Sequence, residues 1–87
     1  MNPTEIEIIP IKPRNGLVAL ASFVINDDIY CGGVGVIVRP NGEYRLTYPT
    51  KLMHSHYMHV FHPINRLAGQ AIEKAVISKY KAIMEED

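Results

Sequence analysis

Apolar and polar residues alternate over most of the chain, and this strand-like pattern gives way to a helical one near residue 62. Three clusters of turn-forming residues interrupt the alternation: Asn15-Gly16, Asn26-Asp27-Asp28 and Pro40-Asn41-Gly42. An Asn-Gly pair is typical of tight β-hairpins. The pattern therefore predicts strands over residues 5–11, 17–25, 29–38 and 44–48. Because tight turns join neighbouring strands, we expect an antiparallel meander.

The C-terminal third predicts the end of the sheet and one long helix. A polar linker near residues 50–56 leads to a last strand at about 57–61, so we expect a sheet of four to five strands. Apolar residues then recur at helical spacing from about Arg66 to Met84. The stripe that we expect to face the sheet consists of Ala68, Ala71, Ile72, Ala75, Val76 and Ile83. The chain is therefore predicted to be an α+β domain with one C-terminal α-helix.

Three residues between the last strand and the helix carry structural signals. Pro63 lacks the N–H that a sheet ladder uses, and it favours an extended conformation for His62. Asn65 belongs to the residue types that accept hydrogen bonds from the first free N–H groups of a helix. We expect His62, Pro63 and Asn65 to form the entry to the helix, with His62 hydrogen-bonded there.

The strand over residues 17–25 is apolar on both of its faces. Val18 and Leu20 alternate with Ala19 and Phe23, so both sides of the sheet need cover at this strand. A helix of about 20 residues covers on the order of 30 by 10 Å, whereas each face of such a sheet offers on the order of 20 by 20 Å. One helix covers one face only. The uncovered face predicts a partner, and we expect that partner to be a second copy of the chain.

The helix also carries a polar side, which we expect to lie opposite the apolar stripe. Its residues are spaced by four, four and seven positions: Arg66, Gln70, Lys74 and Lys81. One interpretation is an ordinary solvated helix face. The other is a cationic surface that meets a phosphate backbone, together with Lys51 and the nearby Arg39 and Arg45. The sequence leaves both interpretations open.

Length and charge limit the possible classes of protein. The chain has 87 residues and a formal net charge of zero, so we expect one domain over residues 1–87 and no general polyanion binder. The segment from Arg39 to Lys81 nevertheless contains seven basic residues and only two acidic ones, and this excess predicts a local positive patch. No apolar run approaches the ~20 residues of a membrane span, and the first residues do not resemble a signal peptide. We expect a cytoplasmic protein without a membrane partner, and the single Cys31 fits a reducing compartment.

Four histidines lie within nine residues and raise the question of a metal site: His54, His56, His59 and His62. His54 and His56 would share one side of an extended segment, which permits occasional metal binding. His59 and His62 would point to opposite faces of a strand, so the four rings do not easily converge on the tetrahedral geometry that zinc needs. We expect no metal site and no cofactor.

The segment Cys31-Gly32-Gly33-Val34-Gly35 is rich in glycine but does not predict a phosphate-binding loop. Such loops precede a helix, whereas a strand rich in valine and isoleucine follows here. We expect the glycines to mark a bulge or a close backbone approach, possible also at a dimer contact. Cys31 could pair with a histidine as a nucleophile, but the spacing offers no third orienting group. We expect no catalysis and no small-molecule substrate.

Several of these segments together resemble the stage V sporulation protein G (SpoVG) family of septation regulators. The resemblance covers nearly the whole chain and rests on the order of the elements and on three motifs: Ala21-Ser22, Tyr48-Pro49-Thr50-Lys51 and His62-Pro63-Ile64-Asn65. It implies a small α+β homodimer that binds DNA and RNA and is linked to division septum formation and sporulation. By position, it implies nucleic-acid contacts at Lys51, Arg66 and Lys74, and also at Lys81.

We therefore expect a non-enzymatic, homodimeric regulator with modest affinity for nucleic acid. The binding residues are expected to be Lys51, Arg66, Gln70, Lys74 and Lys81. The alternative, from another class, is a structural or protein-interaction module that uses its sheet edge or apolar face and binds no nucleic acid. The two differ in salt dependence, because binding to phosphates weakens steeply as salt rises.

Overall fold

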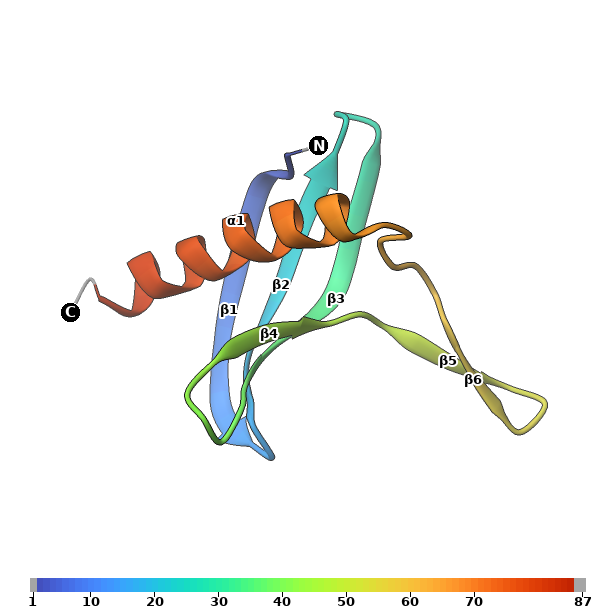
Figure 1. The fold of residues 1–87 in the computed structure, drawn as a ribbon, viewed down its shortest axis with the longest axis horizontal. Coiled ribbons are helices and arrows are strands. Elements are labelled where there is room, and N and C mark those ends of the chain that lie inside the picture. Colours follow the sequence, from blue (N-terminus) through green and yellow to red (C-terminus); the bar gives the residue numbers. More distant parts are fainter. Residues whose placement is uncertain (1, 86–87) are drawn as a thin grey trace.

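The computed structural model describes residues 2–85 and contains six strands and one helix among them. Their bounds are β1 (Thr4–Arg14), β2 (Leu17–Ile25), β3 (Ile29–Val38), β4 (Tyr44–Thr47), β5 (Thr50–Met53), β6 (His56–His59) and α1 (Arg66–Met84). Strands β1 to β4 form one antiparallel sheet in chain order, whereas β5 and β6 form a separate two-stranded sheet (Figure 1). The predicted α+β class, the meander and the helix from Arg66 to Met84 are confirmed.

The turns of the sheet follow from their residue types. Asn15 and Gly16 have φ values of 50° and 87°, and Asn26 and Asp27 have φ values of 55° and 57°. Two successive residues with positive φ make the turn whose twist matches that of the flanking strands, and asparagine, aspartate and glycine tolerate it best. The hairpins predicted at both places are therefore confirmed.

The glycines of β3 allow a bulge and a close approach. The register between β2 and β3 shifts where Ser22 faces both Gly32 and Gly33, and Gly33 has a φ of 72°. A Cβ atom on Gly35 would lie 2.6 Å from Cγ2 of Thr47. Both expected roles are confirmed, and the crowding at Gly35 comes from the chain's own β4.

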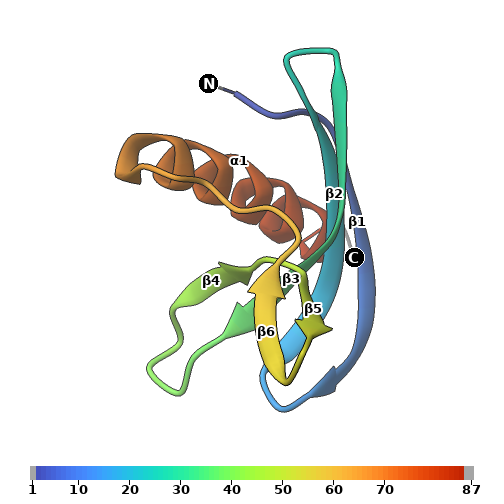
Figure 2. The ribbon, with the colours of Figure 1, turned by 90° about the vertical axis from the view of Figure 1, so that its right-hand side faces the viewer.

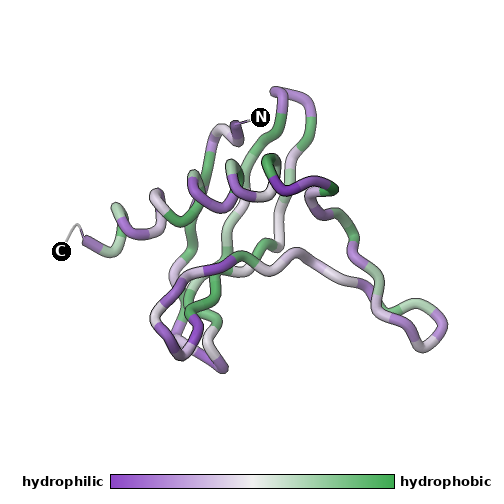
Figure 3. The backbone as a smooth tube through the Cα atoms, viewed as in Figure 1, coloured by the Kyte–Doolittle hydropathy of each residue, from purple (hydrophilic) through white to green (hydrophobic). Residues whose placement is uncertain are grey.

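The core lies between the sheet and α1. Its largest fully buried side chains are Phe23, Val34, Val36 and Val76. Apolar residues follow the first three strands behind the helix, as Figure 3 shows. The predicted stripe on the helix is confirmed for its buried members Ile72 and Val76. Tyr80, which the prediction did not include, is also buried, and its ring packs 5.4 Å from the ring of Tyr44 on β4.

The helix crosses one face of the sheet and leaves the other face uncovered by the described chain (Figure 2). On the uncovered face, Ile9 of β1 pairs in register with Leu20 of β2, and their side chains are 62% and 40% exposed. The prediction that one helix covers only one face is confirmed. Dimerisation, which was inferred from this uncovered face, stays a prediction.

The segment after β4 differs from the prediction. Instead of a polar linker over 50–56 and a fifth strand of the sheet over 57–61, β5 and β6 form a hairpin that projects from the body (Figure 1). We call this hairpin, Thr50–His59, the arm. Its turn residues His54 and Ser55 have φ values of 49° and 71°, the geometry that asparagine and glycine normally supply. The predicted single sheet of up to five strands is thus wrong in this part.

Asn65 stands at the N-cap of α1 in an extended conformation, and its Oδ1 accepts a hydrogen bond of 2.8 Å from the N–H of Ala68. His62 donates through Nδ1 to the carbonyl oxygen of Pro63 at 2.8 Å. We expect Asn65→Ala to lower the free energy of unfolding by about 1 kcal/mol, because a helix N–H loses its acceptor. Urea denaturation measures this loss. Asn65→Asp keeps the acceptor and should retain most of the stability; an equal loss in both variants would show that the cap contributes nothing.

Candidate nucleic-acid interface

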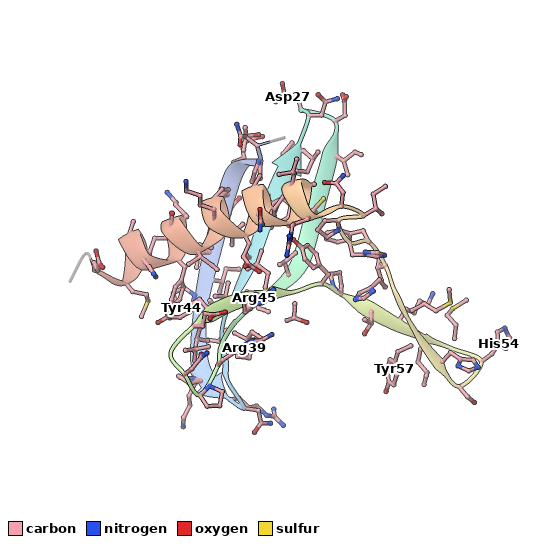
Figure 4. The ribbon with its side chains drawn as sticks, viewed as in Figure 1. Asp27, Arg39, Tyr44, Arg45, His54 and Tyr57 are labelled. Carbon is pink, nitrogen blue, oxygen red and sulfur yellow. The ribbon has the colours of Figure 1, made fainter. Side chains whose placement is uncertain are left out.

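A polar groove lies between the first half of α1 and the edge strand β4. It has a volume of about 470 Å³. Arg66, Gln70 and Glu73 line it from the helix, and Arg45 and Leu46 line it from β4. Arg45 lies below the helix in Figure 4. Two of the predicted binding residues, Arg66 and Gln70, therefore share one groove.

Glu73 ties the helix to the edge of the sheet inside this groove. Its Oε2 atom accepts hydrogen bonds from Nε of Arg45 at 3.1 Å and from the backbone N–H of Leu46 at 3.4 Å. The second bond satisfies an outward N–H of an edge strand, which would otherwise stay open. Glu43 also lies 3.8 Å from Arg45. The charge of Arg45 is thus largely compensated, whereas Arg66 has no ion pair among residues 2–85.

Three of the four predicted helix residues, Arg66, Gln70 and Lys81, lie on the side of α1 that borders β4. Arg66 and Gln70 line the groove with β4, and Nζ of Lys81 lies 5.5 Å from the ring centroid of Tyr44. All four are exposed. We call Arg66, Gln70, Lys74 and Lys81 the cationic flank. The sequence predicts a polar side opposite the sheet-facing stripe, and the structure places Arg66, Gln70 and Lys81 of that side beside the edge strand β4.

Lys51 lies apart from the cationic flank. It is exposed on β5 of the arm, which points away from the helix (Figure 1). Among residues 2–85, no hydrogen bond or ion pair joins it to α1. One protomer therefore brings together the helix residues but does not bring Lys51 to them.

Sequence reasoning missed the residues that shape the groove. Glu73 is one of only two acidic residues between Arg39 and Lys81. An acidic side chain among so many basic ones is a signal for an ion pair. Its partner Arg45 is 28 positions away, so helical spacing could not reveal the pair. Tyr48, which follows β4, also lines the groove.

Tyr48 has an unusual environment for its hydroxyl group. The oxygen is buried and has no hydrogen-bond partner among the described residues. Burial, with smaller contributions from the negative charges of Glu73 and Cys31, raises the pKa of Tyr48 to about 12. The folded protein therefore holds this phenol in its neutral form more strongly than the unfolded chain does.

The raised pKa predicts a loss of stability at alkaline pH. Between the ordinary pKa of 10.0 and about 12, the unfolded chain releases the Tyr48 proton while the folded protein keeps it. The free energy of unfolding should therefore fall as pH rises through this range. Tyr48→Phe should reduce this fall and cost little stability at pH 7, because the hydroxyl has no partner to lose. Urea denaturation at pH 7 and pH 11 tests both points; Tyr57→Phe, on the exposed arm, should leave the fall unchanged.

The histidines are divided between the arm and the helix entry. His54 and His56 lie at the end of the arm, and the rings of His59 and His62 stand 4.7 Å apart between centroids. Within residues 2–85, no three histidine, cysteine, aspartate or glutamate side chains gather as ligands for a metal ion. No helix among residues 2–85 is both long and apolar enough to cross a membrane.

The geometry thus defines a small α+β domain with a cationic helix flank beside an edge strand. The sequence model of the SpoVG family matches residues 1–82. A Finegoldia magna protein named "Putative septation protein SpoVG" is 32% identical over 80 residues, which cover 92% of this chain and 74% of the relative.

The chain belongs to the SpoVG family. The family match includes the turns, the four-stranded sheet, the arm and almost all of α1, so it extends across the groove and the cationic flank. The resemblance noted from the sequence motifs is confirmed.

Proposed function

We propose that this protein is a non-enzymatic, homodimeric regulator that binds DNA or RNA through the cationic flank of α1. One observation carries the proposal: Arg66, Gln70, Lys74 and Lys81 are all exposed on one side of one rigid helix. A row of cations and amide donors on a helix can follow the phosphates of a nucleic-acid backbone. The absence of an ion pair at Arg66 within the described residues supports this use.

The biological role proposed for the chain is in division septum formation and sporulation. Membership of the SpoVG family and the name of the Finegoldia magna relative support a role of this kind. A regulator that binds nucleic acid with modest affinity suits the small number of cations on the flank, because each phosphate contact adds only a limited, salt-sensitive contribution.

The low reactivity expected of the Cys31 thiol supports the non-enzymatic part of the proposal. Its side chain is 7% exposed, and burial raises the pKa of its thiol. A thiol with a raised pKa is a poor nucleophile at neutral pH, since the thiolate is the reactive form. The cysteine therefore serves as a small apolar residue of the core.

The homodimer is supported by the apolar surface that one chain leaves exposed. The uncovered sheet face, the arm and the start of the helix all present large apolar side chains to solvent. Ile64 and Leu67, at the helix start, are 89% and 78% exposed. Large apolar patches on small domains mark contacts with other proteins.

The same exposed residues favour a second candidate function, a protein-interaction module that binds no nucleic acid. Fluorescence anisotropy with labelled single-stranded DNA, duplex DNA and RNA at 50 mM salt distinguishes the two. The regulator should raise the anisotropy of at least one probe at micromolar protein concentration. If none of the probes binds, the interaction module is the better account.

A further inference from the structure

The arm is a hairpin that lacks support from its own protomer. All ten residues from Thr50 to His59 are exposed. Figure 1 shows β5 and β6 standing clear of the four-stranded sheet. A two-stranded hairpin is only marginally stable in water unless it packs against something else. The arm therefore requires a surface on which to pack.

Both faces of the arm carry exposed apolar side chains, Leu52 and Tyr57 on one and Met53 and Met58 on the other, and only the second face also carries Lys51. The register pairs Leu52 with Tyr57 and Lys51 with Met58. Because side chains alternate between the faces of a strand, Leu52 and Tyr57 share one face and Lys51 lies on the other. Leu52 is 57% exposed and Tyr57 75% exposed. The first face is thus an apolar surface without a partner in the described chain.

A second surface without a partner lies at the start of the helix. An apolar groove of about 380 Å³ opens there between the end of the β2–β3 hairpin and α1. Phe23 and Ile72 form its floor from the core, and Ile29 and Ile64 line it while remaining 58% and 89% exposed. Leu67, in the first turn of α1, is also exposed. An apolar groove with such exposed sides fits an apolar hairpin.

The distribution of exposed apolar residues favours the arm and this groove over the open face of the sheet. Among the described residues, the large exposed side chains on the arm or near the groove are Ile29, Leu52, Met53, Tyr57, Met58, Val60, Ile64 and Leu67. On the open face, β1 and β2 expose Ile9 and Leu20, and Tyr30 of β3, which alternates with the buried Cys31, is 71% exposed. The arm and the edges of the groove therefore expose more large apolar side chains than the open face does.

Charge complementarity supports the same pairing. The arm carries Lys51 and three histidines and contains no acidic residue. The groove adjoins the acidic turn Asp27-Asp28, because Ile25 and Ile29 on either side of that turn line it. In Figure 4, Asp27 and His54 lie at different ends of the protomer. The arm can approach the acidic turn only if that turn belongs to another molecule.

We infer that the arm of each protomer docks, with its Leu52–Tyr57 face inward, in the apolar groove of a second copy of the chain. The exchange is reciprocal, so one two-fold axis relates both contacts.

This inference rests on the proposed homodimer and gives Lys51 a place in the nucleic-acid surface. With Leu52 and Tyr57 facing inward, Lys51 faces outward from the docked arm. Asn65 is one of the residues that line the groove, and the next residue, Arg66, is the first of the helix. Docking thus brings Lys51 of one chain to the start of the other chain's helix, near Arg66, and one protomer alone cannot bring these two cations together.

Cross-linking between two different single-cysteine proteins tests the docking. Both carry Cys31→Ser; one also carries Tyr57→Cys on the arm, and the other Ile29→Cys at the groove. After exchange at low concentration and mild oxidation, the mixture should give a covalent dimer on a non-reducing gel, and each protein alone should give none. Met58→Cys, on the opposite face of the arm, replaces Tyr57→Cys in the matched control and should not cross-link.

The inference is overturned if the mixture gives no covalent dimer, or if either protein alone cross-links as strongly as the mixture. A second variant tests it without cysteines: Leu52→Asp with Tyr57→Ser should convert the dimer to a monomer in light scattering after size exclusion. A wild-type monomer that binds oligonucleotides would refute the docking and the homodimer, and would leave nucleic-acid binding through the cationic flank standing. A cross-linked dimer that binds no probe would refute the proposed function alone.

Discussion

Reversal of two charges on the cationic flank should abolish binding to nucleic acid without unfolding the domain. Arg66→Glu with Lys74→Glu changes four units of charge per protomer at the centre of the proposed contact. Both side chains are exposed and lie outside the core, so the fold should persist. Each lost cation removes a phosphate contact, and each new carboxylate repels the backbone. Fluorescence anisotropy with the best-binding probe measures the loss, and circular dichroism checks the fold.

A matched control separates a local effect from a change in total charge. Lys12→Glu with Arg14→Glu makes the same change of charge at exposed positions near the end of β1, which is remote in sequence from α1. This variant should retain most of the binding. If both double variants lose binding equally, the protein responds to net charge, and the cationic flank has no special role.

Phe23→Ala should produce the largest loss of stability among single substitutions. The Phe23 side chain is 1% exposed near the end of β2, where the core between sheet and helix meets the apolar groove. Truncation of a buried phenylalanine costs about 3–5 kcal/mol, through lost burial and the cavity left behind. For a domain whose total stability is on the order of 5–15 kcal/mol, much of the protein would unfold under mild denaturant. Urea denaturation monitored by circular dichroism measures the change.

Leu20→Ala provides the comparison on the same strand. Leu20 is 40% exposed on the uncovered face, so its truncation should cost well below the value for Phe23→Ala. An equal loss in the two variants would show that the open face is covered in solution, which would contradict the placement of the dimer contact at the arm and the groove.

Most of the fold could be predicted because local chemistry specifies it. Asn15-Gly16 and Asn26-Asp27 supply residue types that tolerate positive φ, so the hairpins and the strand limits around them could be predicted from the sequence. Asn65 and the spacing of Ile72 and Val76 likewise define the start and the buried side of the helix.

The arm could not be predicted in this way. Its turn has the same positive φ values, but His54 and Ser55 occupy it, and these residue types give no hairpin signal. The strands on either side, Thr50–Met53 and His56–His59, are exposed on both faces, so alternation between apolar and polar residues is weak. Local propensity alone did not indicate the hairpin.

The candidate site was predictable only as a set of helix positions. Their spacing along α1 groups Arg66, Gln70, Lys74 and Lys81 on one side of the helix. The spacing does not show which strand of the sheet lies next to that side. The ion pair between Arg45 and Glu73 depends on contact between β4 and α1, and such long-range contacts are not encoded in any local pattern. Lys51 was assigned to the same surface although the single chain holds it on the separate arm.

The most direct test of the proposed function is the salt dependence of nucleic-acid binding by the wild-type protein. Arg66, Lys74 and Lys81 of the flank together with Lys51 make about four phosphate contacts per protomer, which predict that affinity falls roughly a hundredfold between 50 and 200 mM salt, and further if both protomers engage. An anisotropy titration at the two concentrations should show this steep fall. Affinity that is unchanged between the two concentrations would contradict a phosphate contact through the cationic flank.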